Sequence, residues 1–402
     1  MICCLLISMF ACAFSVAAEE AEDVPVTDEP AVETPSTVVE SYDAYRVKYD
    51  TVSFGKQSIT LLPTDVVGGE LGTAAGRDQV LIMDVDDQAS WTVDVPVDSR
   101  YIMEIVYCAL PGRGIDCQIG VSIDEAAPFL EAKNIAFSRV WKDLGDAEVD
   151  SNGNHVRPEQ EEVLQWQTRQ ARDNNGYTNE EFRFHFAAGQ HTFTLTMVNE
   201  SMAIAEVRLI PVAGRPSYEE YKGSISESEI RKEGLSVTEA ETPLHKSHSM
   251  IYATTDNSSP ATSPSHPTKI RLNTLGQSNW KYSGQWVTWT VDVPEAGYYH
   301  LSFKYRQDFV RGLQAARRLY INDEIPFAEA ECLYFPYNMG FENITLGNGE
   351  EEYLFYFKKG QNTVTLEVVL GDISEVLVDV NNIVAELNDM YRQIIMITGP
   401  SA

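Results

Sequence analysis

Short stretches of alternating hydrophobic and polar residues recur along most of the chain. They include residues 90–95, 101–107, 118–123, 181–186 and 191–197, and Gly, Pro and Asn separate them. A period of two places every second side chain on one face of a strand, whereas a helix needs a period of 3.6 that these stretches lack. The pattern predicts an all-β chain folded as antiparallel sandwiches, with jelly-roll topology as the expected strand order.

The alternation occurs twice because the chain contains an internal repeat. The hexapeptide Trp-Thr-Val-Asp-Val-Pro occupies residues 91–96 and again residues 289–294. Residues 184–192 match residues 355–363 at a shorter offset, so the first copy carries about 27 extra residues. The repeat predicts two tandem β-sandwich jelly-roll domains, namely a first module over 42–215 with an insertion at about 142–181, a linker over 216–235, and a second module over 236–390.

The two ends of the chain differ from the repeat. Residues 1–18 are apolar and end in Val16, Ala17 and Ala18, a small-x-small pattern typical of a signal-peptide cleavage site. Residues 19–41 are acidic and rich in Pro, Thr and Val, which indicates a linker. We therefore expect an extracellular protein, secreted or associated with the cell surface, with a lipid on Cys12 as an alternative. Residues 391–402 are expected to begin a further, truncated segment, and no stretch after the signal peptide approaches the length of a membrane span.

Charge and cysteine content argue against several classes of protein. The formal net charge of −30 repels phosphate backbones, so nucleic acid is not an expected partner. Only Cys108, Cys117 and Cys332 follow the signal peptide, too few for a disulfide framework. Cys108 and Cys117 flank a turn and either form a bond or remain two buried thiols. No zinc, phosphate-loop or serine-hydrolase motif is present, and the repeat takes up nearly all the folded length, so we expect no enzyme activity.

The second copy resembles a known family of sugar-binding folds. Residues 238–241, 284–299 and 360–366, with the motifs Thr-Glu-Ala-Glu, Pro-Glu-Ala-Gly-Tyr-Tyr and Gly-Gln-Asn-Thr-Val-Thr-Leu, resemble the galactose-binding-like jelly rolls of carbohydrate-binding modules of families 6 and 35. The whole chain is also similar to the front part of bacterial extracellular solute-binding proteins of ABC transporters, through residues 137–141, 153–158 and 391–400.

These resemblances imply a secreted, non-catalytic carbohydrate-binding protein that captures poly- or oligosaccharide for a bacterial uptake system. Its expected partners are a glycan and either an ABC transporter or a cell-surface assembly. The alternative is a structural or protein-docking scaffold of such an assembly, because sandwiches of this type occur without a ligand site.

The family resemblance also implies a structural calcium ion in the second module. The ligands carried over are Glu239 or Glu241 from the opening motif and Asp379 from an expected last strand over 376–380. Calcium takes hard oxygen ligands, so such a site would join the first strand to the last. The alternative is that these are ordinary exposed carboxylates.

Loop aromatics are the expected sugar-binding side chains, because an aromatic ring stacks on the apolar face of a sugar. In the second copy these are Trp280, Tyr282 and Tyr337, with Asn338 as a hydrogen-bonding neighbour. Trp289 and its counterpart Trp91 alternate with Val on their strands and are expected in the cores. The insertion of the first copy either forms a lid over a binding site or packs against a sandwich edge or the second module.

Overall fold

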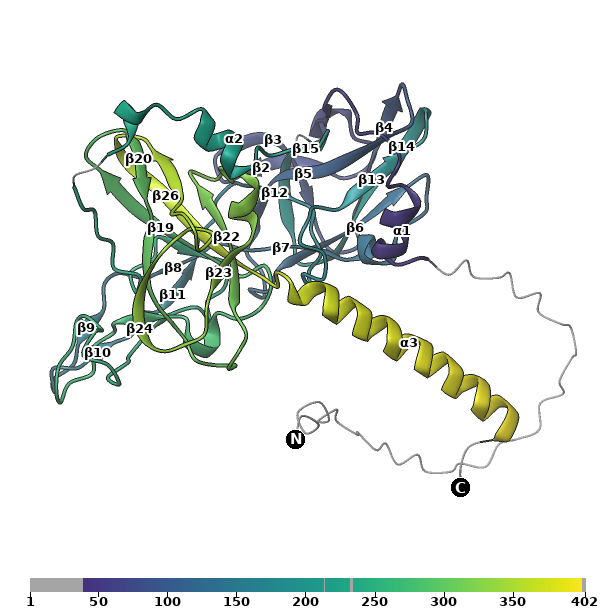
Figure 1. Cartoon of the computed structure of the whole chain (residues 1–402). Helices are drawn as coiled ribbons and strands as arrows, with labels where there is room; N and C mark the ends of the chain where they lie inside the picture. The colour runs from purple at the N-terminus through teal and green to yellow at the C-terminus, as the bar shows by residue number, and fades with distance from the viewer. Residues whose placement is uncertain (1–38, 213, 232–233, 400–402) are drawn as a thin grey trace, which may run out of the picture. The chain divides into compact units, whose positions relative to one another are not determined.

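The computed structural model describes residues 39–212, 214–231 and 234–399, and strands account for most of the regular structure (Figure 1). The predicted signal peptide over 1–18 and nearly all of the predicted linker over 19–41 lie outside the described residues. The first module has two sheets around one core. The smaller sheet has the order β4 (Gln88–Val95), β14 (Gly189–Asn199), β6 (Cys117–Ile123), β7 (Ile135–Phe137). The larger has the order β12 (Gln167–Gln170), β5 (Ser99–Ala109), β15 (Met202–Ile210), β3 (Arg77–Met83), β2 (Glu70–Ala74), with β1 (Ile59–Leu61) on β15 and β13 (Arg183–Phe186) on β5.

The second module repeats part of this arrangement. Its main sheet contains β16 (His245–Lys246), β19 (Trp286–Val293), β26 (Gly360–Val369), β22 (Ala315–Ile321) and β23 (Leu333–Phe335). Three two-stranded ribbons complete it, namely β17 (Ala253–Thr254) with β18 (Thr274–Leu275), β20 (Gly297–His300) with β25 (Leu354–Phe357), and β21 (Ser302–Gln307) with β24 (Asn338–Thr345). The all-β prediction is confirmed.

The repeated tryptophans lie in the two cores, as their alternation with Val predicted. Trp91 is 2% exposed and Trp289 is 6% exposed. The Trp91 indole N–H donates to the Leu62 carbonyl at 2.8 Å, and the Trp289 indole N–H donates to the Ala240 carbonyl at 2.9 Å. Each ring therefore fills its core and satisfies its one polar atom on the segment that precedes the sandwich.

Each module begins with a short helix that the sequence analysis did not predict. Helix α1 (Tyr42–Lys48) follows the N-cap Ser41, and α2 (Tyr218–Gly223) follows the N-cap Ser217. The rings of Tyr42 and Tyr218 pack on Phe129 and Phe327 with centroids 4.7 and 4.9 Å apart. The second module therefore starts at Ser217, and the prediction of a linker over 216–235 is wrong for its first residues, because the tyrosines of α2 belong to the core.

The insertion of the first copy adds strands to the second module. Strands β8 (Trp141–Asp143) and β11 (Gln160–Glu162) extend the second module's main sheet in the order β11-β8-β16-β19, with Lys246 of β16 opposite Trp141 of β8. The buried Lys246 ammonium forms an ion pair with Asp143. The insertion also contains the hairpin of β9 (Glu148–Val149) and β10 (His155–Val156). Of the two readings of the insertion, these pairings favour packing between the modules.

The chain leaves the second module as a long helix rather than a strand. Helix α3 (Ile373–Thr398) includes residues 376–380, so the expected last strand and the all-strand second module over 236–390 are wrong there. Seven of its exposed apolar residues follow an alternating spacing of four and three, which is a helical period; they are Val376, Val380, Ile383, Leu387, Met390, Ile394 and Ile397. Within the described ranges, no helix is long and apolar enough to cross a membrane.

The three cysteines among the described residues are free thiols. Cys108 and Cys117 are buried, and Cys332 is partly buried. Of the two alternatives for Cys108 and Cys117, the structure has the unpaired thiols. Burial raises the pKa of Cys117 to about 12, so this sulfur stays protonated and packs as a small apolar group.

Candidate functional site

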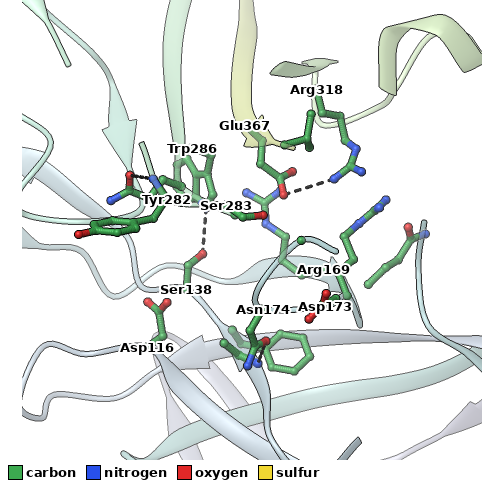
Figure 2. Close-up of a pocket in the computed structure, with 18 of the residues that line it drawn as sticks. Asp116, Ser138, Arg169, Asp173, Asn174, Tyr282, Ser283, Trp286, Arg318 and Glu367 are labelled. Atoms are coloured by element: carbon green, nitrogen blue, oxygen red, sulfur yellow. Dashed lines mark hydrogen bonds and ion pairs between the residues drawn. The ribbon is translucent and has the colours of Figure 1, made fainter. Parts of the chain in front are cut away.

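A cavity of about 340 Å³ lies where the two modules meet (Figure 2). The first module contributes residues near β6 and β7 and the segment 169–179, and the second contributes the turn 282–286 and side chains of β22 and β26. The volume is at the lower end of the range for ligand pockets. Two loops approach each other closely at the border of the cavity. A Cβ atom added to Gly176, whose φ is +72°, would lie only 2.1 Å from Ser283 Oγ.

Tyr282 is the exposed aromatic side chain of this cavity. Its ring is 61% exposed. The turn that carries it is held by the buried side chain of Gln285, whose Oε1 accepts the backbone N–H groups of Lys281 and Tyr282 at 2.8 and 2.9 Å. The Lys281 ammonium lies 5.2 Å from the centroid of this ring. Because the backbone of the turn is already fixed, little ordering entropy remains to be lost when a ligand stacks on the exposed ring.

Trp286 forms a second aromatic wall, but it is almost fully covered. It is 5% exposed, and its indole N–H donates to Ser138 Oγ of the first module at 2.9 Å. The Arg169 guanidinium lies 5.0 Å from the Trp286 ring centroid and 5.8 Å from that of Tyr320 (Figure 2). Trp286 therefore joins the modules and orients Arg169 toward the cavity.

The floor of the cavity carries a buried ion pair. Arg318 Nη1 lies 3.4 Å from Glu367 Oε1, and the Tyr320 hydroxyl donates to Glu367 Oε2 at 2.6 Å. Burial alone would raise the pKa of Glu367, but the positive charges of Arg318, Arg172 and Arg169 outweigh it and lower that pKa. The carboxylate therefore stays ionised at neutral pH and accepts hydrogen bonds.

Two further carboxyl groups line the cavity on the side of the first module. Burial raises the pKa of Asp116, against the opposing effect of His248 and Arg139. Burial also raises the pKa of Asp173, although Asp173 Oδ2 accepts the Tyr177 backbone N–H at 2.7 Å. Together with Arg169 and Asn174, these groups offer hydrogen-bond donors and acceptors beside an exposed ring, which suits a ligand rich in hydroxyl groups.

The structure separates the residues that the sequence analysis grouped. Tyr282 lines the cavity, whereas Trp280, Tyr337 and Asn338 do not. Trp280 packs edge-on against Trp289 with ring centroids 6.0 Å apart. Its indole N–H donates to the Gln285 carbonyl at 3.2 Å, so Trp280 stabilises the turn that carries Tyr282. Asn338 begins β24, and its Oδ1 accepts the Gly340 N–H at 3.1 Å.

The residues proposed to bind calcium do not fit a metal site. Asp379 lies exposed on α3 and not on a strand beside the opening motif. Glu239 is exposed and Glu241 partly buried, and burial and the neighbouring Glu239 raise the pKa of Glu241, which disfavours the ionised ligand. Over residues 39–212, 214–231 and 234–399, no three His, Cys, Asp or Glu side chains lie close enough to hold a metal ion. The predicted calcium ion therefore receives no support from these three residues.

Trp286 and Arg169 are site residues that sequence reasoning missed. Trp286 lies on the same face of its strand as Thr288 and Thr290, which is the face opposite to Trp289. A tryptophan on the otherwise polar face of an alternating strand was the sequence feature that could have identified it. Arg169 gave no signal, because only the pairing of β12 with β5 brings it toward the second module.

Comparisons with known proteins find only partial likenesses to solved structures, at low identity. The chain matches no protein-family model and no curated protein. Among solved structures, it is similar to a Podospora anserina GH26-CBM35 β-(1,4)-mannanase, with 14% identity, a TM-score of 0.24, and coverage of 40% of this chain and 29% of that chain. It is also similar to the C-terminal CBM6 of a marine laminarinase from Zobellia galactanivorans, with 12% identity, a TM-score of 0.21, and coverage of 38% and 99%. A family 35 carbohydrate-binding module from Clostridium thermocellum gives 9% identity, a TM-score of 0.19, and coverage of 40% and 97%.

The chain spans less than a third of the mannanase and nearly all of the two isolated modules. At such identities and TM-scores the likenesses carry no argument about ligand or activity.

Proposed function

We propose that this chain is a secreted, non-catalytic carbohydrate-binding protein that holds a short oligosaccharide in the cavity between its two modules. The observation that carries the proposal is the exposed Tyr282 ring on a fixed turn, which lines the same cavity as a set of carboxylate, amide and guanidinium groups. An aromatic face beside converging polar groups is the usual chemistry of sugar recognition.

The proposed role is capture rather than cleavage, and the proposed setting is the cell exterior. We place the protein in a bacterial uptake system, where a transporter or a surface assembly would receive the captured glycan. The sequence motifs resembling sugar-binding modules and the front part of solute-binding proteins support this setting.

Calorimetric titration with a panel of neutral and acidic oligosaccharides tests the proposal. We expect saturable binding that Tyr282→Ala weakens at least tenfold, which corresponds to about 1.4 kcal/mol, because the stacking surface is removed. Tyr337→Ala is the matched control, since this tyrosine lies outside the cavity and its removal should leave the affinity unchanged.

Other outcomes would contradict the proposal in distinct ways. Loss of binding with Tyr337→Ala but not with Tyr282→Ala would move the site to the turn before β24. A flat response of the wild-type chain to every sugar would favour the scaffold alternative, and release of reducing ends by the pure protein would show that the role is not capture alone.

A further inference from the structure

The second module lacks one strand that the first module has. In the first module, β15 lies between β5 on one side and β3 and β1 on the other. In the second module, β20 and β21 stand where β5 stands, since Tyr299 and Tyr305 repeat Tyr101 and Tyr107. Within the described residues, β20 pairs with β25 and β21 pairs with β24, and no strand takes the place of β15.

The neighbours of this open position show the effect of the missing strand. On β5, Tyr101, Met103, Ile105 and Tyr107 are at most 3% exposed. Their counterparts in the second module are only partly buried; these are Tyr299, Leu301, Phe303 and Tyr305. Residues 234–240, which lead toward β16, form no strand, and Leu235 and Val237 are 89% and 72% exposed. The core side chains beside the open position are therefore not fully covered.

The backbone of β21 points unpaired groups into this position. In the first module, Arg100 directs its N–H and C=O groups to the side of β15, where they bond Ser53 and Gly55 at 2.9 and 3.0 Å. Alternate residues of a strand direct these groups to the same side. By the repeat, Ser302, Lys304 and Arg306 direct theirs into the open position, and nothing in the described part of the chain bonds them there.

The chain's own next segment is a poor occupant. The repeat aligns residues 373–381 with β15, but these residues begin α3. Glu375 would then stand where the fully buried Ile204 stands, and burying an unpaired carboxylate is strongly unfavourable. A second copy of the chain offers no free strand of this kind either, because its β15 is already paired on both sides.

We propose that the second module binds an extended segment of another polypeptide, which adds a strand of about nine residues antiparallel to β21, as β15 does in the first module. Alternate apolar side chains would cover Phe303 and Tyr305. The register also predicts which charge the incoming strand should carry. Lys304 occupies the position in the second copy that Val106 occupies in the first, and the partner of Val106 in β15 is Glu206. An acidic residue at that position of the incoming strand would face the Lys304 ammonium.

The charged side chains of β21 reach across the open position. Arg306 forms an ion pair with Asp256 at 2.6 Å, and Lys304 Nζ donates to the Ala261 carbonyl at 2.5 Å. These side-chain contacts hold the loop 256–262 near β21 without using the β21 backbone. The incoming strand would replace side-chain bridges by a ladder of main-chain hydrogen bonds.

Hydrogen–deuterium exchange of the full chain tests this proposal with a peptide of the sequence of residues 201–212 as the probe. In the free chain, the amides of Ser302, Lys304 and Arg306 should exchange at least a hundredfold faster than those of Glu104, Val106 and Cys108. The peptide should slow their exchange at least tenfold, and a peptide with Pro in place of Ile204 and Val207 should not.

Two proline variants provide a matched pair. Proline is tolerated on a strand where the N–H group is unpaired and disrupts a strand where it is paired. Lys304→Pro should leave the melting temperature within a few degrees of wild type and abolish the effect of the peptide, whereas Val106→Pro should lower the melting temperature sharply.

Three results would overturn the proposal. Protection of the β21 amides in the monomeric free chain would mean that its own residues close the position. Protection that grows with protein concentration would identify a second copy as the occupant. Amides that stay unprotected at millimolar peptide would show that the edge accepts no strand.

Discussion

Replacing Arg139 with Met is expected to lower the free energy of unfolding by about 3–5 kcal/mol, measured by urea denaturation at pH 7. The Arg139 side chain is fully buried, and its Nη2 lies 2.5 Å from Oε2 of Glu200, which is 2% exposed. Its other N–H groups donate to the Ile115 and Leu110 carbonyls at 2.6 and 2.7 Å. Without the guanidinium, the buried Glu200 carboxylate keeps only the exposed Arg113, and the Glu162 carboxylate and the two carbonyls lose the donor that Arg139 provides.

The neighbouring Arg113 offers a control for this variant. It bonds the same Glu200 at 2.8 Å, but its side chain is 70% exposed, so Arg113→Met should cost less than about 1 kcal/mol. The double variant Arg139→Met with Glu200→Leu should recover much of the loss, because a buried ion pair replaced by apolar residues is close to neutral. A loss below about 1 kcal/mol for Arg139→Met alone would contradict the buried-charge argument.

Replacing Glu181 with Gln is expected to flatten the acid dependence of stability between pH 4.5 and pH 2. The Glu181 carboxylate contacts Arg172 and lies 3.1 Å from Arg215 Nη2. Burial raises the pKa of Glu181, but the positive charges of the two arginines lower it by more, so that it falls from 4.5 to about 2. Because the folded pKa is the lower one, this contribution is complete above pH 4.5 and disappears as the pH falls toward 2. It amounts to about 3 kcal/mol.

Denaturation curves of the wild type and Glu181→Gln at pH 7, 4.5, 3.5 and 2.5 measure this contribution. The wild type should lose about 2–3 kcal/mol more than the variant over the acid part of the range. Glu180→Gln is the matched control, since Glu180 forms an ion pair with Arg183 but its side chain is 46% exposed. Equal acid slopes for wild type and Glu181→Gln would show that the arginines do not hold the Glu181 charge.

The strands could be predicted from the sequence because their signal is local. The five residues from Trp91 to Val95 alternate between apolar and polar, and burial follows that alternation in the structure. The same local rule produced the error at residues 376–380, where Val, Leu and Val mimic a strand. The helical spacing that contradicts it becomes visible only over the longer stretch from Val376 to Ile397.

The candidate site could be predicted only in part, because it is assembled from both copies. Tyr282 was accessible to sequence reasoning, since an aromatic residue in a polar turn is an exposed one. Arg169 and Trp286 meet only after β12 pairs with β5 and the insertion joins the second module's sheet. Such contacts between distant segments leave no periodic trace in the sequence.

The pairing of β8 with β16 also determines whether the two halves of the chain can be produced as separate proteins. A product that starts at Ser217 would keep Lys246 without Asp143 and would present β16 as a bare edge. A product that stops before Ser217 would carry the β8–β11 hairpin with no sheet to join. The two halves of the duplication are therefore expected to be expressed, purified and inherited only together.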